Sequence, residues 1–315
     1  MSDSHSRIAG TGSYLPEQVV TNAELAATVE TSDQWIRTMT GTAQRHIAGK
    51  SETTTEMAAI AATRAMRAAG VLATDIDLIV VATITPDLVF PSSAALLQAR
   101  LGASHVGAFD LSAACSGFVY GLALADAMIS CRKSRIALVV GSERMSTLLD
   151  WTDRSTCVLF GDGAGAAVMV GARRPGIYST HLHADGANPD VLRAPSKHTP
   201  YLHMHGASVF KFAVRGLVEA GAEALQANHV SPNAVSLFVP HQANLRIIEA
   251  AARKLGIPDE RVAITVDRHA NTSAASIPLA LDASVSDGKI RSGDTILLAS
   301  VGGGFTWASA LIEWL

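Results

Sequence analysis

The stretch Asp110-Leu-Ser-Ala-Ala-Cys115-Ser-Gly117-Phe118 leads through a run of small residues to a cysteine. The residues that follow, Val119 to Ser130, have the amphipathic pattern of a helix, so Cys115 is predicted to lie at a strand-to-helix turn. A helix N-terminus favours the thiolate, which is the nucleophilic form of cysteine. The sequence therefore allows a covalent cysteine enzyme, and the alternative interpretation of Cys115 is a small residue buried in the core.

Short apolar runs alternate with helical patterns on both sides of this stretch. The apolar runs predict buried strands at residues 76–83, 136–141, 166–171, 235–240, 262–266 and 295–300. Helical periodicity covers residues 53–69, 92–101 and 210–227. Alternating strands and helices imply an α/β fold with largely buried sheets.

The chain also contains a candidate internal repeat. Cys115 follows a strand that ends near Thr85, and Asn271 follows a strand that ends at His241 at the same spacing of 30 residues. Each half then continues into a small-residue helix, an apolar strand and a glycine-rich turn, 161–165 and 302–305. We expect two fused halves, residues 1–174 and 175–315, with the active site where they meet and 175–200 as the connection.

Length, charge and cysteine content exclude several classes of protein. The 315 residues suit one large α/β unit or two fused halves, and the net charge of −3 argues against general nucleic-acid binding. Three cysteines without a CxxC pattern indicate neither a disulfide framework nor a zinc site, and suit a reducing cytoplasm. The polar segment Met1–Arg7 predicts no signal peptide, and no apolar run is long enough to span a membrane.

Three further segments carry candidate chemistry. His241 comes directly after a predicted strand, where α/β folds place catalytic groups, although a lone histidine is more often structural. Asn271 is also a common type of helix N-cap. The run Gly302-Gly303-Gly304-Phe305-Thr306-Trp307 is either a tight turn or a source of backbone N–H groups for an oxyanion.

Together these motifs resemble the β-ketoacyl-acyl-carrier-protein synthase III family over residues 8–315. The resemblance includes Cys115 in AACSG, His241 in PHQAN, Asn271 in NTSAAS, and the segments GDGAGAAV, GGGFTW and TSDQWI. It implies a thiolase-like fold, a duplicated αβαβα five-layer sandwich, in a homodimer. It also implies that no metal, flavin or nicotinamide is needed, because the CoA thioester is a substrate and not a cofactor.

The resemblance implies a sequence of chemical steps. Cys115 would take an acyl group from a short acyl-CoA, with acetyl-CoA as the expected donor, and malonyl-acyl-carrier-protein would then lose carbon dioxide. His241 and Asn271 would stabilise the resulting enolate, which attacks the acyl-cysteine. The N–H groups of Cys115 and Gly303 would form the oxyanion hole.

Binding residues follow from the same resemblance. Trp35 and Arg154 match the pair that sandwiches the CoA adenine, and a guanidinium over an indole is physically reasonable. The predicted amphipathic helix 244–255 and the nearby Lys211 match the surface that receives acyl carrier protein, an acidic partner. The basic residues of that helix are Arg246, Arg253 and Lys254.

The chain departs from the family pattern at several positions. Met39 and Ala43 replace arginines expected near CoA, and Ala207 replaces a usual asparagine. Phe90 matches the residue that closes the acyl pocket from the partner subunit and suggests a short primer. Val301 takes a position often held by phenylalanine, which leaves room for a longer or branched primer.

The leading interpretation is the initiating condensing enzyme of type II fatty-acid synthesis. A related ketosynthase or acyltransferase of secondary metabolism with another acyl donor is the alternative, and Met39 and Ala43 favour it. A thiolase is disfavoured because it needs a second catalytic cysteine late in the chain, whereas the last cysteine is Cys157. A non-enzymatic scaffold would not require Cys115, His241 and Asn271 together.

Overall fold

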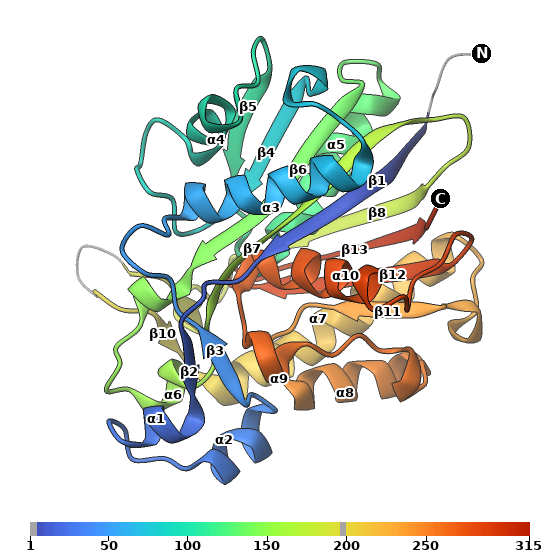
Figure 1. The fold of residues 1–315 in the computed structure, drawn as a ribbon. Coiled ribbons are helices and arrows are strands. Elements are labelled where there is room, and N and C mark those ends of the chain that lie inside the picture. Colours follow the sequence, from blue (N-terminus) through green and yellow to red (C-terminus); the bar gives the residue numbers. More distant parts are fainter. Residues whose placement is uncertain (1–4, 196–199) are drawn as a thin grey trace.

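The computed structural model describes residues 5–195 and 200–315, which form two main β-sheets (Figure 1). In spatial order, the first sheet contains β1 (His5–Tyr14), β7 (Asp162–Ala172), β6 (Ile136–Arg144), β4 (Leu78–Ala82) and β5 (Gly107–Leu111). The second contains β11 (Leu237–Pro240), β12 (Thr295–Gly302), β13 (Thr306–Glu313) and β8 (Ile177–Ala184). Each sheet is therefore built from its own half of the chain.

The two sheets share one arrangement of strand directions. β4 and β6 are parallel, and β7 and β1 continue that sheet in antiparallel pairs. In the second sheet β11 and β12 are parallel, and β13 and β8 continue it in antiparallel pairs. This matching topology agrees with the internal repeat inferred from the spacing of Cys115 and Asn271.

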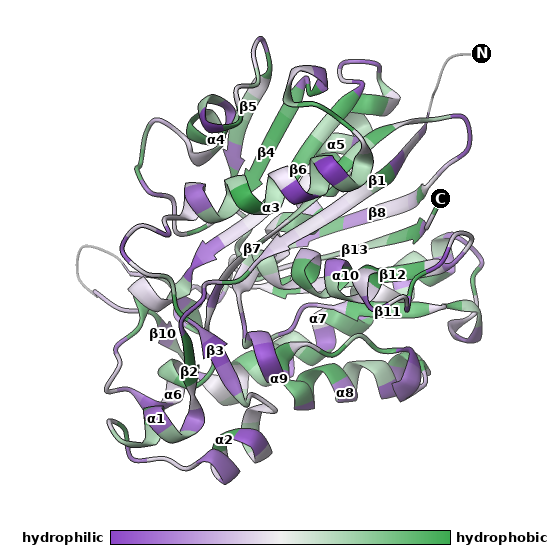
Figure 2. Ribbon diagram, viewed as in Figure 1, coloured by the Kyte–Doolittle hydropathy of each residue, from purple (hydrophilic) through white to green (hydrophobic). Residues whose placement is uncertain are grey.

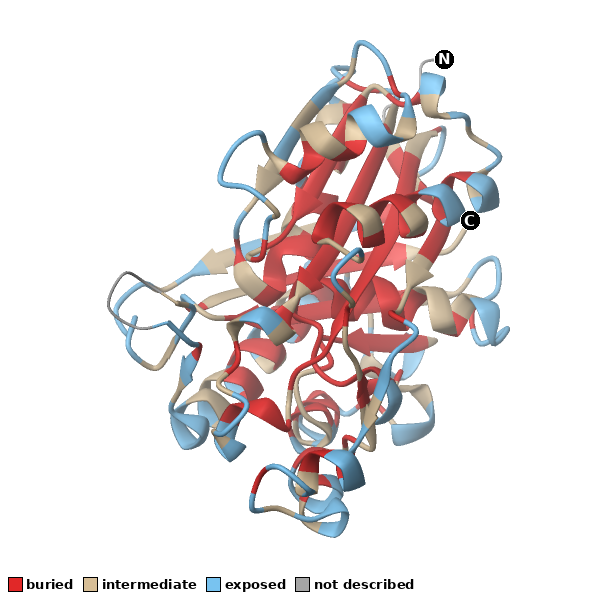
Figure 3. Ribbon diagram, turned by 60° about the vertical axis from the view of Figure 1, so that its left-hand side comes forward, coloured by how far each residue is buried: buried red, intermediate tan, exposed pale blue. Residues whose placement is uncertain are grey.

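Helices divide the molecule into five layers. α5 (Gly117–Ser130) and α10 (Ser276–Ser286) lie between the sheets and share one apolar core with both of them. α3 (Thr54–Ala69) and α4 (Ser93–Leu101) cover the outer face of the first sheet, whereas α7 (Gly206–Ala227) and α8 (Leu245–Leu255) cover that of the second. Buried residues accordingly concentrate in the sheets and the central helices (Figure 3).

The helix after Cys115 is confirmed, but its predicted amphipathic character is wrong. Only Leu124 and Ala127 of α5 are exposed, because this helix packs against both sheets. Figure 2 shows that β4, against which α5 packs, is hydrophobic, in contrast to the hydrophilic residues of α2 (Asp33–Thr40). A central-layer helix thus has no solvent face to encode in its pattern.

The strand predicted at residues 262–266 is also wrong. Val262 makes a single bridge to Phe238, and the chain then enters α9 (Val266–His269). The backbone N–H groups of Thr265 and Val266 donate to the Gln242 side-chain oxygen at 2.8 and 3.1 Å. The Gln242 side chain accepts the hydrogen bonds that a neighbouring strand would otherwise accept, so no β-ladder forms along this segment.

Two segments predicted as irregular contain strands. The predicted connection 175–200 includes β8 and β9 (Leu192–Arg193), which pairs with β10 (His203–Met204), while residues 196–199 lie outside the described part. The predicted turn 161–165 is the beginning of β7. Its Gly165 lets α10 approach, since a Cβ there would lie 2.7 Å from the Cβ of Pro278.

The remaining small elements form a lobe far from the two marked chain ends (Figure 1). They are β2 (Val19–Thr21), α1 (Asn22–Ala26), α2, β3 (Gln44–His46) and α6 (Arg154–Cys157). Within the described ranges, no helix has the length and apolar character that crossing a membrane requires. The segment Met1–Ser4, part of the polar N-terminus discussed above, lies outside the described residues.

Candidate active site

Cys115 lies in the short 3₁₀ turn Ala114–Ser116, between β5 and α5. Ala114 has a positive φ of 48°, which turns the chain sharply before the cysteine. The end of β12 approaches so closely that a Cβ on Gly302 would lie 2.7 Å from the Cys115 nitrogen. A glycine at this place therefore allows the glycine-rich turn of the second half to meet the cysteine of the first.

Asn271 occupies the corresponding place in the second half. It follows Ala270, whose φ is 58°, and precedes the 3₁₀ turn Ser273–Ala275. Its Oδ1 accepts the Ser273 N–H at 2.9 Å in a local turn, whereas the N-cap of the 3₁₀ turn is Thr272, so the interpretation of Asn271 as a helix N-cap is wrong. The amide NH₂ group is thereby left as the part of Asn271 that can donate to a ligand.

His241 follows the end of β11 and is held from behind by Ser276. The Ser276 Oγ accepts the Gln242 N–H at 3.3 Å and lies 2.5 Å from His241 Nδ1. The Ser276 hydroxyl can donate to Nδ1 in one of the two neutral tautomers, and that tautomer carries the imidazole proton on Nε2. In this tautomer His241 presents an N–H donor to a ligand.

A cavity of about 530 Å³ brings the three candidate catalytic residues together: Cys115, His241 and Asn271 all line it. Three residues discussed as departures from the family pattern, Met39, Ala207 and Val301, also line it. So do Trp35, Lys211 and Arg246.

A second cavity of about 230 Å³ also contains Cys115. Its lining is mostly apolar and includes Ile84, Met145, Phe160, Leu192, Leu202 and Gly303. Sequence reasoning missed these apolar residues because they come from separate segments, each of which resembles ordinary core. Phe90, which was assigned to an acyl pocket, lines neither cavity of its own chain and is 84% exposed.

Burial controls the ionisation of the two central groups. Loss of hydration raises the pKa of Cys115 to about 11, although hydrogen bonds from the Ser273 side chain and from the N–H groups of Cys115 and Gly303 act in the opposite direction. The thiolate expected from the helix N-terminus is therefore not the resting form, because desolvation outweighs these dipoles. Burial lowers the pKa of His241 to about 3, so its imidazole is neutral.

Glu143 is a buried carboxyl beside this site that the sequence analysis did not single out. It lies in β6, and burial raises its pKa to about 7. Its side chain accepts hydrogen bonds from Thr83, Thr85, Ile84 and Ser273. The sequence around Glu143 is that of an apolar strand and gives no sign of a functional carboxyl. Its proximity to Cys115 follows only from tertiary contacts.

The expected nucleotide pair is brought together at the surface. The Arg154 guanidinium lies 4.8 Å from the centre of the Trp35 ring, and it also donates to the Glu30 carbonyl at 2.9 Å. Arg246 lies over the Phe210 ring at 5.7 Å and contacts the Met39 sulfur at 3.9 Å. Met39 is thus placed at the cavity, although it lacks the charge of the arginine it replaces.

The predicted basic helix is confirmed as α8. Arg246 is exposed in its first turn, and Arg253 and Lys254 are exposed in its last. Lys211, on the neighbouring α7, is also exposed. Within residues 5–195 and 200–315, no cluster of histidine, cysteine and carboxylate side chains is suited to hold a metal ion.

Comparison with known proteins identifies the family. Residues 109–186 match the family "3-Oxoacyl-[acyl-carrier-protein (ACP)] synthase III", and residues 225–314 match its C-terminal region. A β-ketoacyl-[acyl-carrier-protein] synthase III of Xylella fastidiosa is 53% identical, with 98% of each chain covered. The chain belongs to the β-ketoacyl-acyl-carrier-protein synthase III family. It is accordingly an acyltransferase, and the predicted enzyme class is confirmed.

Solved structures of synthase III support the predicted fold. The synthase III of Aquifex aeolicus superposes with a TM-score of 0.95 at 47% identity, covering 98% of this chain and 100% of that one. The priming β-ketosynthase of the R1128 polyketide pathway superposes with the same TM-score at 39% identity, covering 98% and 96%. The α/β thiolase-like fold is therefore confirmed, and the family function is to initiate fatty-acid synthesis.

Proposed function

We propose that this enzyme loads a short acyl group from acyl-CoA onto Cys115 and condenses it with malonyl-acyl-carrier-protein. The observation that carries the proposal is that Cys115, His241 and Asn271 line one cavity, while a separate apolar cavity begins at the same cysteine. One cavity can hold the pantetheine arm of each substrate in turn, and the other can hold the acyl chain. Such a division suits a two-step transfer through a covalent intermediate.

In the first step the Cys115 sulfur attacks the thioester carbonyl. A bond forms between sulfur and the acyl carbon, the bond from that carbon to the CoA sulfur breaks, and CoA leaves as the thiol with the proton of Cys115. The N–H groups of Cys115 and Gly303 are proposed to hold the oxyanion, a role supported by their hydrogen bonds towards the Cys115 sulfur. One such donor typically contributes a factor of about 100 or more in rate.

In the second step malonyl-acyl-carrier-protein loses carbon dioxide. The electron pair of the broken C–C bond becomes a thioester enolate. Its carbon forms a C–C bond to the acyl carbon, the bond from that carbon to the Cys115 sulfur breaks, and the released thiolate takes a proton from solvent. The imidazole of His241 is neutral, and in the tautomer with the proton on Nε2 it would donate to the enolate oxygen together with the Asn271 NH₂ group. Donors placed where charge develops accelerate the step because they bind the transition state better than the substrate.

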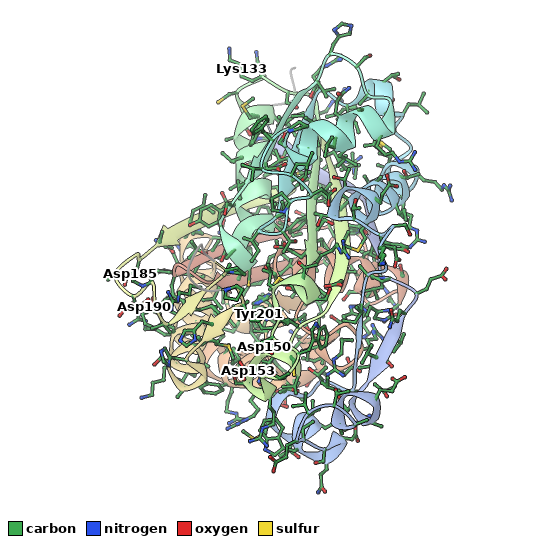
Figure 4. All side chains as sticks on the ribbon, turned by 90° about the vertical axis from the view of Figure 1, so that its left-hand side faces the viewer. Lys133, Asp150, Asp153, Asp185, Asp190 and Tyr201 are labelled. Atoms are coloured by element: carbon green, nitrogen blue, oxygen red, sulfur yellow. The ribbon has the colours of Figure 1, made fainter. Side chains whose placement is uncertain are left out.

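The surface around the cavity supports separate docking of the two substrates. Trp35 and Arg154 would hold the adenine, and Asp150 and Asp153 lie in the segment just before α6, which begins at Arg154 (Figure 4). Lys211, Arg246, Arg253 and Lys254 would receive the acidic carrier protein on α7 and α8. Two substrates can therefore approach one cavity with different recognition groups.

A short primer is favoured by the volume of the second cavity. About 230 Å³ beside Cys115 suits a small acyl group, and we propose acetyl as the first candidate. Val301 lines the larger cavity and not this one, so its small size would widen the pantetheine side. The primer length would then depend on Ile84, Met145 and Leu202.

We also propose that the enzyme works as a homodimer in the cytoplasm. β5 is an edge strand of the first sheet, and its Phe109 is 40% exposed. The nearby loop exposes Leu88, Val89 and Phe90 at 50%, 96% and 84%. An open edge with an apolar patch favours pairing with a second copy, and three unpaired cysteines suit a reducing compartment.

The function is tested by intact-protein mass spectrometry with a panel of acyl-CoAs, followed by malonyl-acyl-carrier-protein. Acetyl loading on Cys115 that is discharged as acetoacetyl-carrier protein is the expected result, and Cys115→Ala should abolish loading. Asn271→Ala should load normally but condense about 100-fold more slowly, because one enolate donor is lost. Normal condensation by that variant would remove Asn271 from the mechanism.

A second candidate function is priming of a secondary-metabolite synthase with another acyl donor. Met39 at the cavity favours it, since methionine lacks the positive charge of the arginine it replaces, as does the likeness to the R1128 priming ketosynthase. Loading only by longer, branched or aromatic acyl groups would support this function instead of the first.

A further inference from the structure

The carboxyl of Glu143 has an asymmetric set of partners. Its Oε2 accepts hydrogen bonds from Thr85 Oγ1 at 2.7 Å, Ile84 N at 3.0 Å and Thr83 Oγ1 at 3.1 Å. Its Oε1 has one such partner, Ser273 Oγ, at 3.0 Å. Among the described residues, no basic side chain donates a hydrogen bond to this buried carboxyl. Its hydrogen bonds all come from hydroxyl and backbone N–H groups.

Ser273 connects this carboxyl to the nucleophile. Both residues line the second cavity, and the Ser273 side chain is among the hydrogen-bonding groups that act to lower the pKa of Cys115. A hydroxyl has a single hydrogen to donate, so Ser273 can donate either to Glu143 or to Cys115, but not to both. The direction of this hydroxyl therefore decides whether the Cys115 sulfur is next to a hydrogen-bond donor or to an acceptor oxygen.

We propose that Glu143 is a positioning residue that turns the Ser273 hydroxyl away from Cys115 and thereby keeps the resting nucleophile in its thiol form. Above pH 7, where Glu143 is ionised, the carboxylate takes the Ser273 hydrogen on Oε1, and the Ser273 oxygen then accepts the hydrogen of the Cys115 thiol. The negative charge of Glu143 acts in the same direction, because it disfavours a thiolate nearby. This inference rests on Cys115 being the nucleophile of the proposed function.

A neutral thiol has a consequence for the enzyme at rest. Thiolates react readily with oxidants and alkylating agents, whereas thiols do not. The arrangement keeps Cys115 poorly reactive until a thioester enters the cavity and the oxyanion donors of Cys115 and Gly303 are engaged. The raised pKa of the cysteine agrees with this arrangement.

Glu143→Gln is the substitution that reverses the hydroxyl with little change of shape. The amide oxygen can replace Oε2 and keep its three donors, since all three point to that atom. The amide NH₂ then replaces Oε1 and donates to Ser273 Oγ, so the Ser273 hydrogen turns to the Cys115 sulfur. The same change removes the negative charge.

The test measures the rate of Cys115 alkylation by iodoacetamide at pH 8, followed by intact mass, with Cys115→Ala to identify the labelled site. Glu143→Gln should alkylate about tenfold faster than the parent, which corresponds to a thiol pKa lower by about one unit. A rate equal to or below that of the parent would overturn the proposal. The thermal unfolding midpoint of Glu143→Gln should stay within a few degrees of the parent value. General damage to the site would lower this midpoint and would not raise the reactivity of Cys115 alone.

Ser273→Ala supplies an independent arm if Glu143→Gln does not fold. In the parent the Ser273 hydroxyl is engaged by Glu143, so its removal should change the alkylation rate by no more than about twofold. A roughly tenfold slower Ser273→Ala variant would mean that the hydroxyl already donates to the thiolate, and would overturn the proposal.

The double variant separates hydrogen bonding from charge. In the Ser273→Ala background, Glu143→Gln should raise the rate by only about threefold, because charge removal alone remains. An equal increase in both backgrounds would exclude Ser273 as the intermediary. Alkylation needs no CoA or carrier protein, so these outcomes are independent of whether the proposed condensation occurs.

Discussion

At the scale of the residue, Cys115 is governed by two opposing effects. A turn at the start of α5 and nearby N–H groups favour the thiolate, as the small-residue run before the cysteine suggests. Burial opposes it and is larger, so the pKa is raised. The sequence indicated a candidate nucleophile at Cys115, but the ionisation of its thiol depends on neighbouring groups from both halves of the chain.

The raised pKa of Cys115 leads to a pH prediction. Because the thiolate is the reactive form, the alkylation rate should rise about tenfold per pH unit from pH 7 to pH 10, without a plateau in that range. The rate is followed by the mass of the labelled protein in the absence of CoA. A plateau near pH 8 would show that dipoles outweigh burial in this site.

At the scale of the element, helix patterns were informative only where one face meets solvent. The pattern at 244–255 predicted α8 and its basic side chains, because its buried residues lie on one face. The pattern in α5 was misleading, since that helix is enclosed by two sheets. The segment 262–266 failed for another reason: the side chain of Gln242 takes the N–H groups that a strand would have paired.

The basic face of α8 leads to a docking prediction. Reversing Arg253 and Lys254 to glutamate should raise the KM for malonyl-acyl-carrier-protein about tenfold at low salt, with a smaller effect on kcat. The difference should shrink as the salt concentration rises, because these side chains are exposed. Steady-state kinetics at two salt concentrations measure both effects.

The matched control for α8 is Arg67→Glu. Arg67 is an exposed arginine on α3, in the layer that covers the other sheet. It should leave the KM for the carrier protein unchanged, and an equal increase in this variant would point to net charge and not to docking on α8.

At the scale of the whole molecule, the two sheets have matching strand directions, and Cys115 and Asn271 occupy matching places between them. Division of the chain at residue 174 into two halves stays a proposal, supported by the strand content of each sheet. It explains how residues far apart in sequence come to line one cavity: each half supplies the end of a strand and a turn to the same junction.

The exposed edge of the first sheet leads to an assembly prediction. Val89→Asp combined with Phe109→Asp should convert a dimer to a monomer in sedimentation velocity, since two charges would be buried without partners at the proposed contact. Activity should fall with the dimer if Phe90 of the partner subunit closes the acyl pocket. A Leu72→Asp control changes another exposed apolar residue, 69% exposed, and should remain dimeric.

The chain by itself determined the family and the α/β class, and it singled out Cys115, His241 and Asn271 as the proposed catalytic residues, because these depend on local motifs in a fixed order. Only the tertiary structure revealed the hydrogen bond between Glu143 and Ser273, the position of the second cavity, and the raised pKa of the Cys115 thiol. The physical reason is that burial and hydrogen-bond direction arise from atoms of distant segments. A pattern read along one segment contains the chemistry of a side chain but not the dielectric and the partners that surround it.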